Sequence, residues 1–251
     1  MNEFRTALSF LTVLPVGRSG ERPALERAFP YFPVIGAGIG AAAGGLGAAA
    51  AEIWSPAVGA AAALAALAIL TGGLHADGLA DTADGWAAHP GAVRTPEGRS
   101  AVLTAMRDPR PGTAGVLALI LVLGLQWTLL LELSLSAWMW SLAIVGSFSR
   151  LGMVLAAQGG RALTPDSGLG AEALNRKSFG RTAAAAAVAW GIAAGGVGLG
   201  PAAGILAASG LFAAACGRLF QRRFGGLTGD MLGAVNELTG LFLLLLLTRF
   251  F

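Results

Sequence analysis

Long apolar stretches without any charged side chain dominate this chain. Residues 113–131 and 182–217 contain no Asp, Glu, Lys or Arg. A helix of about 20 apolar residues can cross the hydrocarbon core of a membrane. Only 12% of the 251 residues are charged, whereas soluble domains carry about a quarter. The sequence therefore predicts an all-α, polytopic transmembrane helical bundle that forms a single integral membrane domain over residues 1–251.

The apolar stretches divide into seven expected spans joined by short turns and longer polar segments. The fifth and sixth spans are rich in Gly and Ala and are only marginally long enough to cross a membrane. The expected spans are 31–53, 57–74, 113–133, 137–157, 182–197, 201–217 and 231–247.

Basic residues gather in every second connection. The polar segments 1–30, 75–112, 158–181 and 218–230 hold nearly all Arg and Lys, and the turns 54–56, 134–136 and 198–200 hold none. Positive loops stay on the cytoplasmic side of a membrane. We therefore expect the N-terminus and the functional face in the cytoplasm. The net charge of +3 reports this topology and gives no reason to expect a nucleic acid partner.

The N-terminal segment and one glycine repeat have structural interpretations. Phe4, Leu8 and Leu11 share a helical face, which suits a helix in the membrane interface or an ordinary cytosolic arm. Gly36, Gly40 and Gly44 repeat every four residues, a spacing that lets two helices approach closely, within one chain or between subunits. The single cysteine, Cys216, excludes a disulfide framework.

An acidic motif follows the second expected span. Residues 72–85 read GGLHADGLADTADG. If this segment is helical, Asp77, Asp81 and Asp84 fall at i, i+4 and i+7, on one face. Three like charges on one face repel each other, and a divalent cation would offset that repulsion. The alternative is a solvated acidic loop.

Arginines before the third expected span form a second motif. Arg107 and Arg110 flank Asp108, and small residues follow where a helix would start. Arginine and a helix N-terminus both bind phosphate oxygens. The same pattern could anchor the loop at the membrane, with Asp108 as a partner or cap.

Polar residues inside the fourth and seventh expected spans form a third set. Arg150 lies about two turns from the end of its span, so it faces the bundle with a partner or extends to the interface. Asp230 begins the last span as a site residue or an N-cap. Asn236 and Glu237 lie within that span, where polar side chains are costly. Carboxylates and arginines on one face suit a metal-dependent phosphoryl or phosphodiester transfer.

The sequence resembles the cobalamin synthase family, the adenosylcobinamide-GDP ribazoletransferases of late vitamin B12 synthesis. Matching blocks cover most of the chain, and the His-x-Asp-Gly-Leu-x-Asp-x-x-Asp-Gly core is the most specific of them. Pro111, Ala76 and Ala114 depart from the residues usual in the family. The matching blocks are 10–16, 72–85, 106–110 with Gly112, Thr113 and Gly115, then 149–150, 228–230 and 233–234.

The resemblance implies a reaction at the bacterial inner membrane that uses Mg²⁺. A ribose hydroxyl of α-ribazole, or of its 5′-phosphate, would attack adenosylcobinamide-GDP and release GMP, leaving adenosylcobalamin or its phosphate. The lower base, the number of metal ions and the oligomeric state stay open, as does contact with other enzymes of the pathway.

Site roles follow from the resemblance. His75 would be the general base, orient Asp77, or be structural, and Asp81 is also assigned to catalysis. The implied metal ligands are Asp77, Asp81, Asp84 and Asp230, and the implied phosphate-binding residues are Arg107, Arg110, Arg150 and Thr228.

Two other classes of membrane protein share part of this motif pattern. CDP-alcohol phosphotransferases also place aspartates and Mg²⁺ at a membrane face, but their motif continues differently after Asp84-Gly85. An ion-coupled transporter could use Arg150 and Glu237, although transporters bind near the midplane within paired repeats. This chain shows no such repeat, and its charges cluster at one face.

Overall fold

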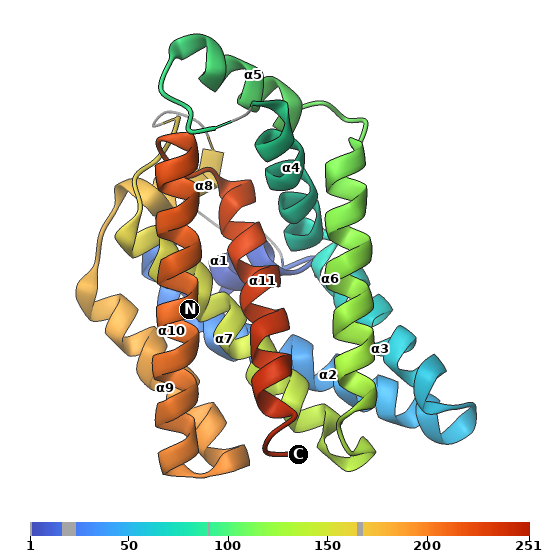
Figure 1. Cartoon of the computed structure of the whole chain (residues 1–251). Helices are drawn as coiled ribbons and strands as arrows, with labels where there is room; N and C mark the ends of the chain where they lie inside the picture. Colours follow the sequence, from blue (N-terminus) through green and yellow to red (C-terminus); the bar gives the residue numbers. More distant parts are fainter. Residues whose placement is uncertain (1, 17–23, 90, 165–167) are drawn as a thin grey trace.

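The computed structural model describes residues 2–16, 24–89, 91–164 and 168–251, and helices make up its regular structure (Figure 1). In that part of the chain a single isolated β-bridge joins Ala162 to Leu227. The expected all-α fold is confirmed. The elements are α1 (Asn2–Leu11), η1 (Leu25–Tyr31), α2 (Phe32–Ile53), α3 (Pro56–Thr71), α4 (Leu74–Ala88), α5 (Pro96–Met106), α6 (Thr113–Leu131), η2 (Leu135–Ala137), α7 (Trp138–Gly159), α8 (Gly168–Asn175), α9 (Phe179–Val197), α10 (Leu199–Phe224) and α11 (Gly229–Leu247).

Membrane-length helices account for most of the expected spans. Five helical segments of the described chain are long and apolar enough to cross a membrane, or six if the bent pair α3 and α4 counts as one span. The fifth expected span corresponds to α9, an Ala- and Gly-rich helix that carries Arg181 and is outside that set. A multi-span membrane bundle is therefore supported, and the count of seven stays a prediction.

The glycine repeat lies where α2 crosses α7. A Cβ at Gly40 would lie 1.8 Å from the carbonyl oxygen of Leu142, and one at Gly36 would lie 2.0 Å from that of Gly146. Gly44 meets Trp138 in the same way. These contacts confirm the packing interpretation and place it within one chain, because the glycine face is covered by α7.

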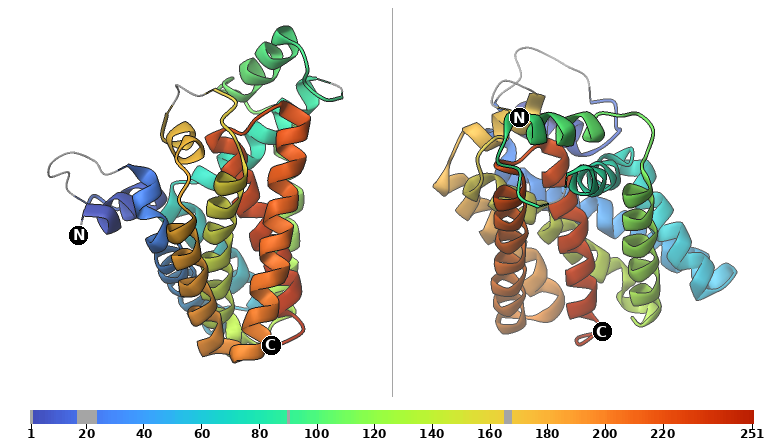
Figure 2. Two further views of the ribbon diagram at one scale, coloured as in Figure 1. Left: turned by 90° about the vertical axis from the view of Figure 1, so that its left-hand side faces the viewer. Right: turned by 45° about the horizontal axis from the view of Figure 1, so that its top comes forward.

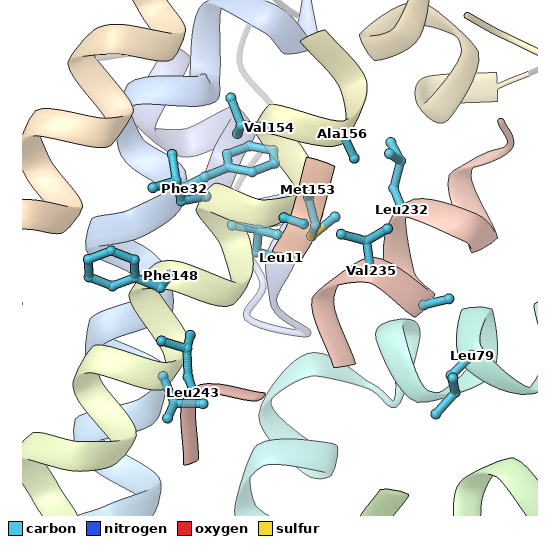
Figure 3. Packing of buried hydrophobic residues seen from close by; sticks show 14 of the residues in the cluster. Leu11, Phe32, Leu79, Phe148, Met153, Val154, Ala156, Leu232, Val235 and Leu243 are labelled. Atoms are coloured by element: carbon cyan, nitrogen blue, oxygen red, sulfur yellow. The ribbon is translucent and has the colours of Figure 1, made fainter. Parts of the chain in front are cut away.

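Helix α7 forms the centre of the bundle, with α2, α9, α10 and α11 around it (Figure 2). Its residues are buried along almost the whole helix. Figure 3 shows Met153 of α7 between Phe32 of α2 and Val235 of α11, with Phe148 further along α7 in the same core cluster. Large apolar side chains elsewhere point outward, as expected for lipid-facing helices; Ile120 is 61% exposed and Leu211 is 73% exposed.

A sharp break separates α3 from α4. The two helices meet at 90°, and the residues between them, Gly72 and Gly73, have φ values of +63° and +70°. Glycine adopts this left-handed conformation without the steric cost that a side chain adds. The N-terminal arm supports the break, because the Val13 N–H donates to the Leu70 carbonyl at 3.0 Å.

The polar segments 75–112, 158–181 and 218–230 gather at one end of the bundle, which we call the α5 end. In Figure 1 this end lies opposite the C-terminus, and helix α1 of the segment 1–30 lies near mid-height of the bundle. The expected loop 75–112 is largely the two helices α4 and α5. The loops after α7 and α10 pair there, since the Leu163 N–H donates to Leu227 and the Leu227 N–H donates to Arg161, both at 2.8 Å. Residues 17–23 of the expected segment 1–30, and residues 165–167 of the loop 158–181, lie outside the described residues.

Candidate functional site at the α5 end

The acidic motif forms a helix, as its spacing predicted. Asp77, Asp81 and Asp84 lie on α4 at intervals of four and three residues. Asp77 is exposed, and Asp81 and Asp84 are half-buried. The solvated acidic loop considered above is therefore wrong, since α4 packs between α6 and α11.

Glycines bring α4 and α11 into backbone contact. A Cβ at Gly78 would lie 2.6 Å from the carbonyl oxygen of Asp230, and one at Gly233 would lie 3.3 Å from the Cα of His75. This approach places Asp230 beside the acidic face of α4. The Asp81 carboxylate consequently experiences the negative charges of Asp77, Asp230 and Asp84.

Thr228 and Asp230 have different roles at the start of α11. Thr228 is the N-cap, and its hydroxyl accepts from the Met231 N–H at 3.3 Å. The same hydroxyl lies 3.4 Å from Asp230 Oδ2, to which it donates. Asp230 is thus not the cap of this helix, which leaves its carboxylate available to a ligand.

Asp84 has partners of its own. Its Oδ2 accepts from the Gly112 N–H and its Oδ1 from the Gly115 N–H, both at 2.8 Å. Those N–H groups belong to the N-terminal turn of α6, where a carboxylate is favoured by the helix dipole. Asp84 therefore joins α4 to α6, and its role as a metal ligand stays a prediction.

The carboxylates at the α5 end meet the requirements of Mg²⁺ only in part. Mg²⁺ prefers oxygen ligands and is usually held by one or two carboxylates, with water and substrate phosphates completing the shell. Within the described ranges no three His, Cys, Asp or Glu side chains converge closely enough to hold one metal ion. A cage of all four aspartates is therefore not formed. The like charges around Asp81, which has no ion-pair partner among the described residues, do fit a cation held by one or two carboxylates.

Arg107 meets the start of α11 across a cavity at the α5 end. The cavity has a volume of about 230 Å³, and its lining includes Arg107, Thr228, Gly229 and Asp230. Arg107 ends α5 and exerts an electrostatic effect on Asp230. The structure thus brings together three of the residues assigned from the sequence.

Arg110 is placed differently from Arg107. Its side chain is 86% exposed, and its guanidinium donates to both oxygens of Asp108, at 3.1 and 3.0 Å. These side-chain bonds, with that from the Arg110 N–H, lower the pKa of Asp108 to about 2. Arg110 would have to leave Asp108 before its fork could bind a phosphate.

Arg150 lies in a second, interior cavity of about 70 Å³, which none of the four aspartates lines. Its side chain is 5% exposed, so it does not extend to the interface. Arg150 donates to Ser149 at 3.1 Å, and Glu237 lies across the same cavity. His75 lines this cavity too, and its Nε2 has no partner among the described residues.

Three residues of the site region were missed from the sequence. Gln126 donates to Glu237 at 3.4 Å. The position of Gln126, a single amide side chain within an apolar span, could have indicated that it has a polar partner on another helix. Arg223 donates to the carbonyls of Trp86 and His89 and lies 4.9 Å from the centroid of the Trp86 ring. Lys177 donates to the Ala157 and Gly160 carbonyls at the end of α7. Arg223 lies in the last turn of α10 and Lys177 lies between α8 and α9, and the sequence alone indicates no partner for either charge.

Fold and site together define a multi-helix membrane protein with a carboxylate- and arginine-lined site at one end. The model of the cobalamin-5-phosphate synthase family matches residues 3–248. The chain belongs to that family.

Curated relatives agree with this assignment over nearly their whole length. A protein of Bradyrhizobium diazoefficiens named adenosylcobinamide-GDP ribazoletransferase is 39% identical, with 99% of this chain and 94% of that protein aligned. Proteins with the same name from Leptothrix cholodnii and Chlorobaculum tepidum are 35% and 37% identical, covering 94% and 93% of this chain and 90% and 89% of their own. No solved structure matches the chain.

Proposed function

We propose that this chain transfers the cobinamide phosphate of adenosylcobinamide-GDP to α-ribazole or α-ribazole 5′-phosphate, with Mg²⁺, at the cytoplasmic face of the bacterial inner membrane. The observation that supports it most directly is the Asp81 carboxylate, surrounded by like charges beside the cavity of Arg107, Thr228 and Asp230. Phosphoryl transfer needs this pairing of acidic and basic groups, because it depends on positioning and on charge stabilisation. Family membership argues against the CDP-alcohol phosphotransferase and transporter interpretations.

The proposed reaction forms one bond to phosphorus, breaks another and transfers one proton. A ribose hydroxyl oxygen of the ribazole forms a bond to the phosphorus on the cobinamide side of the diphosphate. The bond from that phosphorus to the bridging oxygen breaks, and GMP leaves with the electron pair. The hydroxyl proton passes to a base, for which His75 is our candidate because its Nε2 has no partner among the described residues and because His75 also lines a cavity with Gly229 and Asp230.

The chain's own residues have separate tasks in this scheme. One or two carboxylates of the group Asp77, Asp81 and Asp230 would hold the Mg²⁺, which would neutralise phosphate oxygens when bound. Arg107 and the Thr228 hydroxyl face the cavity where the diphosphate would bind, and Arg107 offsets the charge that develops on the leaving oxygen. Asp84 keeps α4 against α6, so that the aspartates stay in register with α11.

The cytoplasmic orientation is supported by the charge distribution. The α5 end carries the arginines of α5, of the end of α10 and of the loop after α7. The short connections at the opposite end, residues 54–56, 134–136 and 198–200, carry none. This asymmetry is what the positive-inside rule describes.

GMP release by detergent-purified protein tests the proposal. The assay contains adenosylcobinamide-GDP and either ribazole form, with and without Mg²⁺, and compares wild type with Asp81→Asn. We expect metal-dependent turnover that falls by at least about 100-fold in Asp81→Asn, because a positioned charge contributes several kcal/mol to such transfers. Glu52→Gln, at the opposite end of the bundle, is the matched control. Absence of turnover by folded wild type with both ribazole forms would contradict the proposal.

A further inference from the structure

A further pocket lies along α5, next to the cavity that Arg107 shares with the start of α11. It has a volume of about 490 Å³, within the range of about 300–1,000 Å³ that small-molecule sites occupy. Arg94, Arg99 and Arg107 line it together with the hydroxyl groups of Thr95, Ser100 and Thr104. Among the residues that the structure describes, no carboxylate lines this pocket. Such a set of donors suits a phosphate group.

The three arginines are available to a ligand. None of them forms an ion pair within the part of the chain that the structure describes, where Asp108 is paired with Arg110 and Glu26 with Arg176 and Arg181. All three are exposed. A ligand would therefore not have to displace an existing carboxylate from this pocket, as it would at Arg110.

The backbone around this pocket is fixed by α10. The Val93 N–H donates to the Arg223 carbonyl at 2.7 Å, next to Arg94. The Arg223 side chain is buried and holds the carbonyl of Trp86 at 3.0 Å and also that of His89. Thr95 then caps α5 by accepting from the Gly98 N–H at 3.1 Å. Arg94 and Arg99 are thus presented from anchored backbone, which lowers the entropy lost on binding.

Arg107 connects this pocket with the cavity at the start of α11, because it lines both. A ligand with two linked phosphates can therefore extend from Asp230, past Arg107, to Arg99. One end of that path is acidic and suits the phosphate that is attacked. The other end has only basic and hydroxyl donors and suits a phosphate that leaves as a monoester anion.

We propose that the α5 pocket, formed by Arg94, Arg99, Ser100, Thr104 and Arg107, binds the nucleoside monophosphate half of the diphosphate donor and the nucleotide that leaves. This inference rests on the proposed function and adds to it the direction in which the donor lies. The cobinamide phosphate is placed at Asp81 and Asp230, and the guanosine phosphate on α5. An anionic lipid headgroup shares the phosphate chemistry and is the competing occupant.

Equilibrium binding of GMP tests the pocket independently of turnover. Titration calorimetry would use protein in phosphatidylcholine nanodiscs, comparing wild type, the double variant Arg94→Gln/Arg99→Gln, and Arg222→Gln. Arg222 is an exposed arginine in the last turn of α10 that does not line this pocket, so it controls for the loss of positive charge. We expect GMP affinity to fall by at least about tenfold in the double variant, the size of one lost charged contact, and to change less than twofold in Arg222→Gln. Equal GMP affinity in wild type and the double variant would overturn the assignment.

Steady-state kinetics and a lipid comparison separate the remaining outcomes. The double variant should raise KM for the donor and leave KM for α-ribazole unchanged. If phosphatidylglycerol in the nanodiscs displaces GMP from wild type but not from the double variant, both compete for this phosphate site and the assignment stands. If the double variant loses phosphatidylglycerol binding but keeps its GMP affinity, the pocket is a headgroup site and the assignment fails. GMP binding that depends on Arg94 and Arg99, without turnover, would instead contradict the proposed reaction and leave the pocket intact.

Discussion

The carboxylate of Asp84 on α4 accepts the backbone N–H of Gly115 on α6 at 2.8 Å. In the sequence these two helices are separated by the polar segment that contains α5. The second carboxylate oxygen of Asp84 accepts the Gly112 N–H at the same distance. One side chain of the acidic motif therefore acts as the N-terminal cap of a neighbouring helix. The acidic motif thus combines two tasks, because its other aspartates, Asp77 and Asp81, lie toward Asp230.

Asp84→Ala should destabilise the protein more than it affects the chemistry of the aspartate cluster. The change removes two charge-assisted hydrogen bonds, each worth about 1.5–3 kcal/mol. We expect a thermal midpoint in detergent several degrees below that of wild type. Asp81→Ala is the matched comparison, and it should leave the midpoint unchanged or raise it, because it removes like-charge repulsion. Equal midpoints for wild type and Asp84→Ala would contradict the capping role.

The α2–α7 crossing offers a sharp glycine test. Gly40→Ala should be strongly destabilising, since its Cβ would lie 1.8 Å from the Leu142 carbonyl oxygen. Gly38→Ala, two residues earlier, should be neutral or stabilising by up to about 1 kcal/mol, because no described atom beyond its own stretch of helix lies within 4 Å of its Cβ and alanine favours helix. Thermal unfolding of both variants in one detergent measures the difference. Similar behaviour of the two variants would show that α2 does not approach α7 this closely.

Arg150 and Glu237 line the same interior cavity, so we expect that the effects of their substitutions on stability are not additive. Arg150→Met leaves Glu237 without its facing cation, and Glu237→Gln leaves Arg150 without its anion. Removal of one partner of a buried ion pair in direct contact costs about 3–5 kcal/mol, whereas replacement of both is often tolerated. Arg150 and Glu237 share the cavity but are not among the ion pairs of the described residues, so we expect a smaller cost here. We expect the double variant to unfold at a higher temperature than Arg150→Met alone. A double variant that is as unstable as the sum of the single changes would exclude coupling.

Asp108 should not contribute to pH dependence near neutrality. Its pKa is lowered from 3.8 to about 2 by the hydrogen bonds from Arg110. A carboxylate with a lowered pKa stabilises the folded state above its ordinary value, and this contribution is lost only as the pH falls through the lowered one. Asp108→Asn should therefore leave the shape of the pH–activity profile near neutrality unchanged. A profile whose midpoint shifts in this variant would show that the pair titrates within the active range.

Several elements followed from local sequence patterns. The expected spans at 31–53, 113–133 and 137–157 begin and end within a few residues of α2, α6 and α7, because length and uninterrupted hydropathy are local properties. The spacing of the three aspartates correctly indicated α4.

Long-range pairings could not be derived in the same way. The spacing of Asp84 matched that of the other aspartates, yet its partners lie on another helix. The sequence grouped Arg150 with Arg107 and Arg110 as phosphate ligands, whereas the structure places it in a separate interior cavity. Both facts depend on how helices pack, and no short window of sequence contains that information.

The break at Gly72 ties the N-terminal arm to the geometry of the site. A Cβ at Gly72 would lie 2.8 Å from the side chain of Val13, and the Val13 N–H holds the Leu70 carbonyl at 3.0 Å. The N-terminal arm thus packs against the break between α3 and α4, at the point where α4 begins. The direction of the acidic helix is consequently set partly by residues about sixty positions earlier in the chain. A sequence change in the N-terminal arm therefore affects the packing at Gly72, and the reverse also holds. In a chimaera that exchanges only the arm or only the residues at the break, α4 and its aspartates would lie at a different angle to α11.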